Sequence, residues 1–171
     1  ILTLFPEMFT ALSASILGRA QKEGKLELNI VNIRDYTEDK HLKCDDYPFG
    51  GGAGMVMMAQ PVGSAVEAVD PAHRARRIYL SPKGRTLCQQ KVFELAAEEE
   101  LVLLCGHYEG VDQRAIDLFI DEELSIGDYV LTGGELPAMV VIDCVARYVD
   151  GVLSPASLVQ ESFSENLLEY P

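Results

Sequence analysis

The feature that most constrains the fold is an uninterrupted apolar run, Leu101-Val102-Leu103-Leu104-Cys105. A strand with one face in water alternates apolar and polar residues, whereas a strand covered on both faces is apolar throughout. The run therefore predicts a strand in the middle of a parallel sheet. A chain of 171 residues has room for one domain of ordinary size around such a sheet.

Strand-like and helix-like segments alternate along the rest of the chain. Apolar or alternating patterns predict strands at 1–5, 26–33, 77–80 and 101–105, with a strand-like piece at 125–131. Helices are expected at 6–21, ended by Gly24, and at 61–69, 87–99 capped by Thr86, 112–120 and 135–149. The stretch 34–60 has little periodicity and predicts a long functional loop. This order predicts an α/β fold with a mostly parallel sheet and helices on both faces. Nothing in the periodicity points to a knot.

Composition excludes several classes of protein. The hydrophobic fraction is 48% and the charged fraction 24%, which excludes a disordered chain. The apolar runs are far shorter than the roughly 20 residues of a membrane span, so no membrane association is expected. The opening Ile1–Glu7 lacks the features of a secretory signal. We therefore expect a cytoplasmic protein with reduced thiols.

The cysteines and histidines do not predict a metal site. Cys44, Cys88, Cys105 and Cys144 contain no Cys-x-x-Cys pair, and their spacing matches no zinc motif. The three histidines form no His-x-x-x-His or Glu-x-x-His pair. No serine lies in a Gly-x-Ser-x-Gly turn, so a serine hydrolase is not expected either.

Charge is distributed unevenly along the chain. The net charge is −13, yet residues 1–91 carry 12 Lys and Arg against 10 Asp and Glu, and residues 92–171 carry 2 against 17. The total argues against a nucleic-acid partner. The basic residues of the first half gather, however, and they leave room for a local basic surface. They are Arg34, Lys40, Lys43, Arg74, Arg76, Arg77, Lys83 and Arg85.

Three loops rich in glycine and polar residues follow expected strands. They are Ser81–Gly84, Gly106–Asp112 and Ser125–Pro137. In open α/β sheets, ligands bind outside the carboxyl ends of the strands, and glycine lets the backbone approach a ligand. The loops therefore predict one shared pocket. Each loop alone is also compatible with an ordinary tight turn.

A fourth glycine-rich segment runs from Asp45 to Met55. No Gly-Lys-Ser/Thr follows it, so it is not a phosphate-binding Walker loop, and it is not the dinucleotide-binding Gly-x-Gly-x-x-Gly either. Two interpretations remain open. The segment is a flexible connection, or its flanking residues Tyr47 and Phe49 make a wall on which a flat ring stacks.

At these loops the sequence resembles the bacterial tRNA (guanine-N1)-methyltransferases of the SPOUT class, which act at tRNA position 37. The matching blocks lie in the same order over the whole chain. They are 5–9, Asp45-Asp46 with Gly50–Met58, 78–82, Cys105–Asp112, Ser125–Pro137, 151–153 and Glu161-Ser162-Phe163.

The resemblance implies a fold, an assembly and a methyl donor. The implied fold is an α/β domain with a deep C-terminal trefoil knot. The implied assembly is a homodimer whose active site is shared between subunits, with tRNA as the substrate. S-adenosylmethionine (AdoMet) would supply the methyl group, and Mg²⁺ is often required. Residues 1–155 would be the catalytic domain and 156–171 the start of a linker, with the family's C-terminal helical domain absent.

The resemblance also assigns site residues. The catalytic residues would be Glu161 as general base, where the family usually has Asp, and Arg147. Asp45, Gly52, Ala53, Gly54 and Glu109 would lie on the guanine side. The donor would be held by Tyr79, Leu80, Ser81, Gly106, Tyr108, Ile126, Gly127, Asp128, Tyr129, Val130, Leu131, Gly133, Gly134, Pro137 and Glu169.

The proposed chemistry is consistent with these residue types. Guanine N1 carries a proton and attacks poorly until a base accepts it, and a carboxylate within hydrogen-bond reach can do so. Three other interpretations stay open. They are a non-catalytic RNA-binding module on the same fold, a methyltransferase for another base or RNA, and a nucleotide-dependent oxidoreductase, whose glycine fingerprint is absent.

Overall fold

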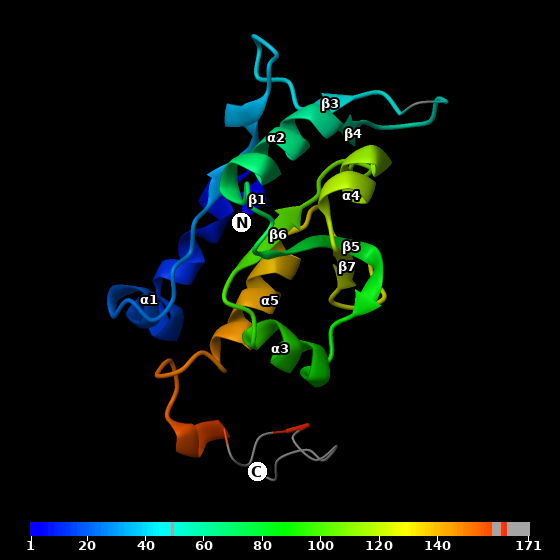
Figure 1. Ribbon diagram of the computed structural model, residues 1–171. Coiled ribbons are helices and arrows are strands. Elements are labelled where there is room, and N and C mark those ends of the chain that lie inside the picture. The colour runs from blue at the N-terminus through cyan, green and yellow to red at the C-terminus, as the bar shows by residue number, and fades with distance from the viewer. Residues whose placement is uncertain (49, 159–161, 164–171) are drawn as a thin grey trace.

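The computed structural model describes residues 1–48, 50–158 and 162–163. Its centre is a five-stranded sheet in the order β2-β1-β6-β5-β7, with every pairing parallel (Figure 1). The strands are β1 (Leu2–Thr3), β2 (Val31–Asn32), β5 (Arg76–Thr86), β6 (Leu101–Cys105) and β7 (Glu122–Ser125). The predicted parallel sheet is confirmed.

Helices cover both faces of this sheet, as expected (Figure 1). One face packs against α2 (Ala59–Val69), α4 (Gln113–Phe119) and the 3-10 helix η2 (Ile33–Tyr36). The other packs against η1 (Pro6–Ser13), α3 (Gln89–Ala96) and α5 (Glu135–Ala146). Within the described ranges, none of the helices combines the length and apolar character that a bilayer crossing requires.

The central strands divide their side chains between the two faces. Val102 and Leu104 of β6 belong to the core under α2 and α4, whereas Leu103 and Cys105 belong to the core under α3 and α5. All four are buried. This alternation is the reason that the strand is apolar throughout.

The single helix expected over 6–21 is wrong, because the segment forms two helices. After η1 the chain extends at Ala14 and turns through Ser15, which has φ 53°. It then continues as α1 (Ser15–Lys22). Gly18 lies against the backbone carbonyl of Ser13, where a Cβ would collide. The expected stop at Gly24 is confirmed by its φ of 67°, a conformation that glycine adopts at helix ends.

Strand β5 does not end at Ser81-Pro82 as the sequence suggested. Leu80 and Arg85 both pair with Leu124 of β7, so residues 81–84 leave the ladder and return to it. Thr86 pairs with Ser125 instead of capping α3, whose N-cap is Cys88. β7 lies earlier than the strand-like piece expected at 125–131.

The strand expected at 26–33 and the loop expected at 34–60 also differ from the structure. Only Val31–Asn32 of the expected strand 26–33 is paired. The long loop expected at 34–60 contains η2 and an antiparallel pair, β3 (Asp45–Asp46) and β4 (Val56–Met57). The chain after α5 reaches a short 3-10 helix, η3 (Pro155–Leu158).

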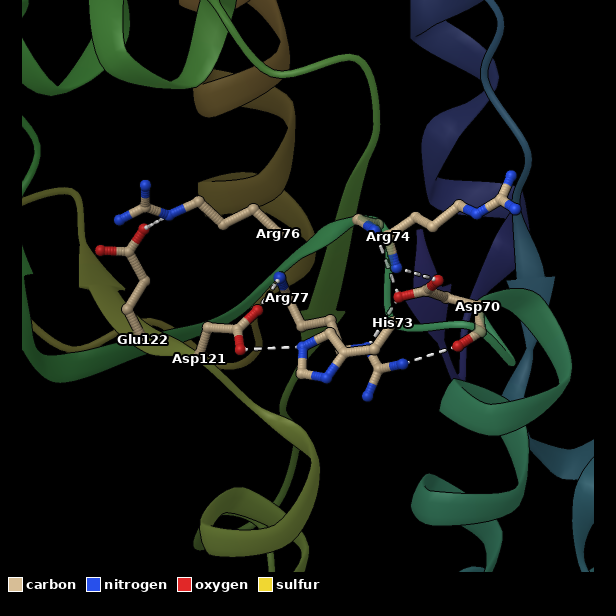
Figure 2. Close-up of polar contacts among 8 residues, drawn as sticks. Asp70, His73, Arg74, Arg76, Arg77, Asp121 and Glu122 are labelled. Carbon is tan, nitrogen blue, oxygen red and sulfur yellow. Dashed lines mark hydrogen bonds and ion pairs between the residues drawn. The ribbon is translucent and has the colours of Figure 1, made fainter.

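Acidic residues hold the arginines at the start of β5 (Figure 2). Arg77 Nε donates to Asp70 Oδ2 at 2.8 Å and its backbone N–H donates to Asp121 Oδ2 at 2.8 Å. Arg76 Nε donates to Glu122 Oε1 at 2.7 Å. Arg76 and Arg77 therefore fix the amino ends of β5 and β7, and their charges are balanced by Glu122 and Asp70.

Candidate functional site

The three glycine-containing loops meet around one cavity of about 240 Å³ at the carboxyl ends of β6 and β7, beside the point where residues 81–84 leave the ladder of β5. Parallel strands bring their carboxyl ends to one edge of the sheet, which explains this convergence. The donor-side residues expected from the sequence that line the cavity are Tyr79, Leu80, Ser81, Gly106, Tyr108, Ile126, Gly127, Tyr129, Val130, Leu131, Gly133, Gly134 and Pro137. Asp128 is not among the lining residues, and Glu169 lies outside the described residues.

Close backbone contacts join the second and third loops. Gly134 N–H donates to the carbonyl of Gly106 at 2.8 Å. A Cβ on Gly134 would lie 2.7 Å from the Cα of Cys105, and one on Gly106 would lie 2.7 Å from the Tyr79 ring. These two glycines are therefore required by contacts within the protein, and not simply by the space that a ligand needs.

A tyrosine hydroxyl and a strained tyrosine lie at the cavity. Burial, and then the charge of Glu123, raise the pKa of Tyr79 above its ordinary value, and the backbone of Val111 offsets this only in part. Its hydroxyl therefore keeps its proton for donation. Tyr108, also in the wall, has φ 60°. A non-glycine residue with positive φ is uncommon and is often found at functional sites.

His107 is a cavity residue that the sequence analysis did not assign. Its ring lies between those of Phe5 and Tyr108, with centroids 4.7 Å and 4.9 Å away. Nδ1 is buried and has no hydrogen-bond partner among the residues that the structure describes. Such an atom calls for an explanation. The sequence signal was its place in the second loop, but a lone histidine was insufficient to assign a role.

Two acidic residues near the cavity were also missed. Glu123 lines it from β7, a strand placed too late along the sequence. Glu135, the first residue of α5, is 2% exposed. Beneath the cavity, burial, followed by the charge of Glu135, raises the pKa of the Cys105 thiol. This cysteine is therefore a neutral core residue, as its spacing suggested.

The glycine-rich segment reaches the cavity through Glu109. Glu109 N–H donates to the carbonyl of Met55 at 2.9 Å, and Met57 N–H donates to the carbonyl of Gly110 at 2.9 Å. Gly54, with φ 87°, lies so close to the Glu109 side chain that a Cβ would collide with it. Glu109 itself lines the cavity.

The other residues expected on the guanine side lie further out. Asp45, Gly52 and Ala53 are not among the cavity's lining residues. Asp45 is in β3 of the hairpin that carries the glycine-rich loop. Gly54 is not a lining residue either, and the hairpin brings it only against the side chain of Glu109.

The expected catalytic pair is not assembled within the described part of one chain. Glu161 lies outside the described residues. Arg147 is exposed and caps the carboxyl end of α5, which has 12 residues, whereas Gly134 and Pro137 meet the cavity at its amino end. At a rise of 1.5 Å per residue, the two ends are about 18 Å apart.

Within the residues that the structure describes, no three or more His, Cys, Asp or Glu side chains lie close enough together to hold a metal ion.

Comparison with known proteins finds one family and relatives that match the whole chain. The family model described as tRNA (Guanine-1)-methyltransferase TrmD matches residues 1–171. A protein named tRNA (guanine-N(1)-)-methyltransferase from Ruminiclostridium cellulolyticum is 59% identical, with all of this chain and 75% of the relative covered. Relatives of the same name from Caldanaerobacter subterraneus and Caldicellulosiruptor saccharolyticus are 57% and 55% identical, with all of this chain and 71% and 70% of the relatives covered.

Proposed function

Because the chain belongs to the tRNA (guanine-1)-methyltransferase TrmD family, we propose that it is a cytoplasmic enzyme that transfers a methyl group from AdoMet to N1 of guanine at tRNA position 37. The observation that carries this proposal is the match over residues 1–171, together with the cavity that the three matching loops line.

The cavity has the chemistry that AdoMet requires. Residues 126–134 lie outside helices and strands, so their peptide groups are not committed to a regular hydrogen-bond ladder and can bind polar groups of a ligand. The wall also offers the buried Nδ1 of His107 and the protonated hydroxyl of Tyr79. AdoMet, when bound, supplies an electrophilic methyl group already activated by its sulfonium.

The residues on the substrate side have a different task. A target guanine must leave its stack to enter a protein pocket, and Glu109 with the adjoining Gly54 forms the edge that such a ring would meet. The proton on N1 must then be accepted. We assign that role to Glu161, and we assign Arg147 to stabilising the charge that develops on the ring oxygen.

This assignment requires two copies of the chain. Arg147 and the cavity lie at opposite ends of α5, so one chain does not bring them together. α5 also presents Leu136 and Val140 to solvent, 49% and 41% exposed, with Met8 of η1 40% exposed. Residues four apart share a helix face, and exposed apolar surface of this kind indicates an interface. The proposed occupant is a second copy, which would place its Arg147 and Glu161 at this cavity.

Mixing two inactive variants tests the shared site. Gly106→Val chains, whose added side chain meets the Tyr79 ring in the cavity wall, and Glu161→Gln chains should each be nearly inactive. If the partner supplies both Arg147 and Glu161, the intact cavity of the Glu161→Gln chain in a heterodimer receives an intact pair from the Gly106→Val chain, and activity returns in the mixture. Inactivity of the mixture despite subunit exchange, or a monomer in light scattering at micromolar concentration, would contradict the shared site.

The knot implied by the resemblance is also a proposal. It is supported by the excursion of residues 81–84 from β7 and by Gly84, where a Cβ would collide with the backbone of Glu123 and Leu124. Pulling the chain from its two ends in an optical trap tests it. A knotted chain should extend to less than its full contour length, and full extension would exclude the knot.

Mg²⁺ is not assigned a step. The residues that the structure describes do not fit a resident metal site, so no part of the proposed chemistry is routed through the ion.

Calorimetry tests the donor assignment directly. AdoMet and S-adenosylhomocysteine should bind the protein, and NAD should not. Binding of NAD without AdoMet would support the oxidoreductase interpretation and overturn this one. Binding of AdoMet without methyl transfer would favour a non-catalytic module.

A further inference from the structure

We propose that Glu135 is a positioning residue for the transfer reaction, and that Thr3 holds its buried carboxylate so that the third loop keeps the shape of the donor cavity. This inference rests on the proposed function. It assigns Glu135 no contact with the donor or the guanine, and it concerns the protein groups that support the cavity wall.

The first observation is the burial of a carboxylate. Glu135 is 2% exposed, and it directly follows Gly133 and Gly134 of the cavity wall. A buried charge is costly unless polar groups compensate it. The carboxylate lies in the first turn of α5, where the helix dipole favours negative charge.

The second observation is a hydrogen bond that joins distant parts of the chain. Thr3 Oγ1 donates to Glu135 Oε1 at 2.7 Å, across 132 positions. The same Thr3 oxygen accepts from the N–H of Phe5 at 2.9 Å, which fixes the direction of its hydroxyl. Thr3 is fully buried at the end of β1. Hydrogen bonds to an ionised acceptor are among the stronger ones in proteins, so this contact anchors the start of α5 to the sheet.

The third observation is the position of the other carboxylate oxygen. Oε2 lies against Gly133, where a Cβ would collide with it, and the same Cβ would lie 3.0 Å from Nδ1 of His107. Gly133 and His107 both line the cavity. The carboxylate therefore reaches from β1 to the junction of the second and third loops.

These contacts give Glu135 a specific role. The third loop lies outside regular secondary structure, so its backbone is not held by a sheet ladder. The bond to Thr3 fixes one end of this loop. Without it, the peptide groups that face the cavity lose their alignment, while the helices and strands around them keep their own contacts.

Three substitutions separate this role from ordinary stability. Thr3→Val removes the hydroxyl and keeps the shape, Thr3→Ser keeps the hydroxyl, and Glu135→Gln keeps the size and removes the charge. Thr10→Val, at an exposed position of η1, is the control. Dissociation constants for AdoMet and S-adenosylhomocysteine, kcat, KM and amide exchange are measured well below each unfolding midpoint.

We expect Thr3→Val and Glu135→Gln to raise the donor dissociation constant and KM by about tenfold or more, since a hydrogen bond to a charged group is lost. Thr3→Ser and Thr10→Val should stay within about twofold of the wild type. Amides of residues 126–134 should exchange faster in Thr3→Val, with those of β6 unchanged.

Unchanged donor affinity and unchanged exchange in Thr3→Val, with only a lower melting temperature, would overturn the proposal. If Thr3→Val does not fold, Glu135→Gln and Thr3→Ser provide the same comparison. If the wild-type protein itself fails to bind AdoMet, the proposed function is wrong, and the exchange experiment still decides whether the bond holds the loop.

Discussion

Arg77 and Asp70 form a buried ion pair at the amino end of β5, remote from the cavity. Arg77 Nε lies 2.8 Å from Asp70 Oδ2, and Nη2 donates to the backbone carbonyl of Asp70 at 2.6 Å (Figure 2). The contact closes the connection between α2 and β5. β5, which contributes residues to the wall of the donor cavity, is therefore fixed at its amino end by a buried ion pair.

Removing one partner of this pair should be strongly destabilising. Arg77→Ala leaves Asp70 buried without its cation, which typically costs about 3–5 kcal/mol. A domain of this size loses roughly 2–4 °C in melting temperature per kcal/mol, which differential scanning calorimetry will detect. Arg74→Ala, at an exposed side chain nearby, should change stability by less than about 0.5 kcal/mol. Equal effects of the two variants would contradict the importance of the pair.

The same carboxylate predicts a dependence of stability on pH. Burial alone would raise the pKa of Asp70, but hydrogen bonds from the N–H groups of Arg74 and Ala75 and from the Arg77 guanidinium outweigh it and lower the pKa. A lowered pKa in the folded state stabilises the protein above the unfolded value of about 3.9, and this contribution disappears as pH falls through the folded value.

Urea denaturation between pH 7 and pH 3 measures this effect. Stability should fall below about pH 4, and Asp70→Asn should fall less over that range, although it is less stable at pH 7. An identical slope in wild type and variant would show that Asp70 does not contribute.

Gly134 should not tolerate even one added carbon. A Cβ there would lie 2.7 Å from the Cα of Cys105 and 2.9 Å from the N of Gly106, and backbone atoms cannot move aside cheaply. Gly134→Ala should therefore lower thermal stability by about 1–3 kcal/mol and weaken donor binding. Gly24→Asn, at a helix end with no atom within 4 Å of the added Cβ, should be close to neutral. A stable Gly134→Ala protein with normal donor affinity would contradict this prediction, because it would mean that the second and third loops can move apart without a loss of stability or of donor binding.

Glu161 is expected to act on turnover alone. Glu161→Gln should lower kcat by at least about 10²-fold, the lower range for general-base catalysis, and leave the donor dissociation constant unchanged. Glu161→Asp should be neutral or better, since it introduces the residue usual in the family. Glu165→Gln should be nearly silent, and Glu169→Gln should weaken donor binding. Normal turnover by Glu161→Gln would transfer the role to Glu109, the carboxylate that lines the cavity.

Much of the fold could be predicted where one local pattern dominates. The strand β6 was predicted with its observed bounds, and α2 and α4 were predicted to within two residues at each end, because burial alone sets their pattern. β7 was placed too late, since Glu122 and Glu123 look like exposed acids. Glu122 instead bonds Arg76 and Lys91, which are partners that a local pattern does not reveal.

The same limit applies to the site. Glycines at the strand ends pointed to three loops, and parallel topology brought them together. The buried Glu135 was not predicted, because its partner Thr3 is 132 positions away and appears in the sequence as an ordinary strand residue. The break between η1 and α1 was missed for a different reason, because it depends on the positive φ of Ser15 and on the close contact of Gly18 with Ser13, which residue pattern alone does not reveal.

The most direct test of the proposed activity is the identity and position of the methylated nucleoside. The protein is incubated with methyl-labelled AdoMet and an unmodified tRNA transcript that has guanine at position 37, and the digested RNA is examined by mass spectrometry. We predict 1-methylguanosine at position 37, and no label when that guanine is replaced by adenine. Label in another nucleoside, or at another position of the tRNA, would contradict the proposed function.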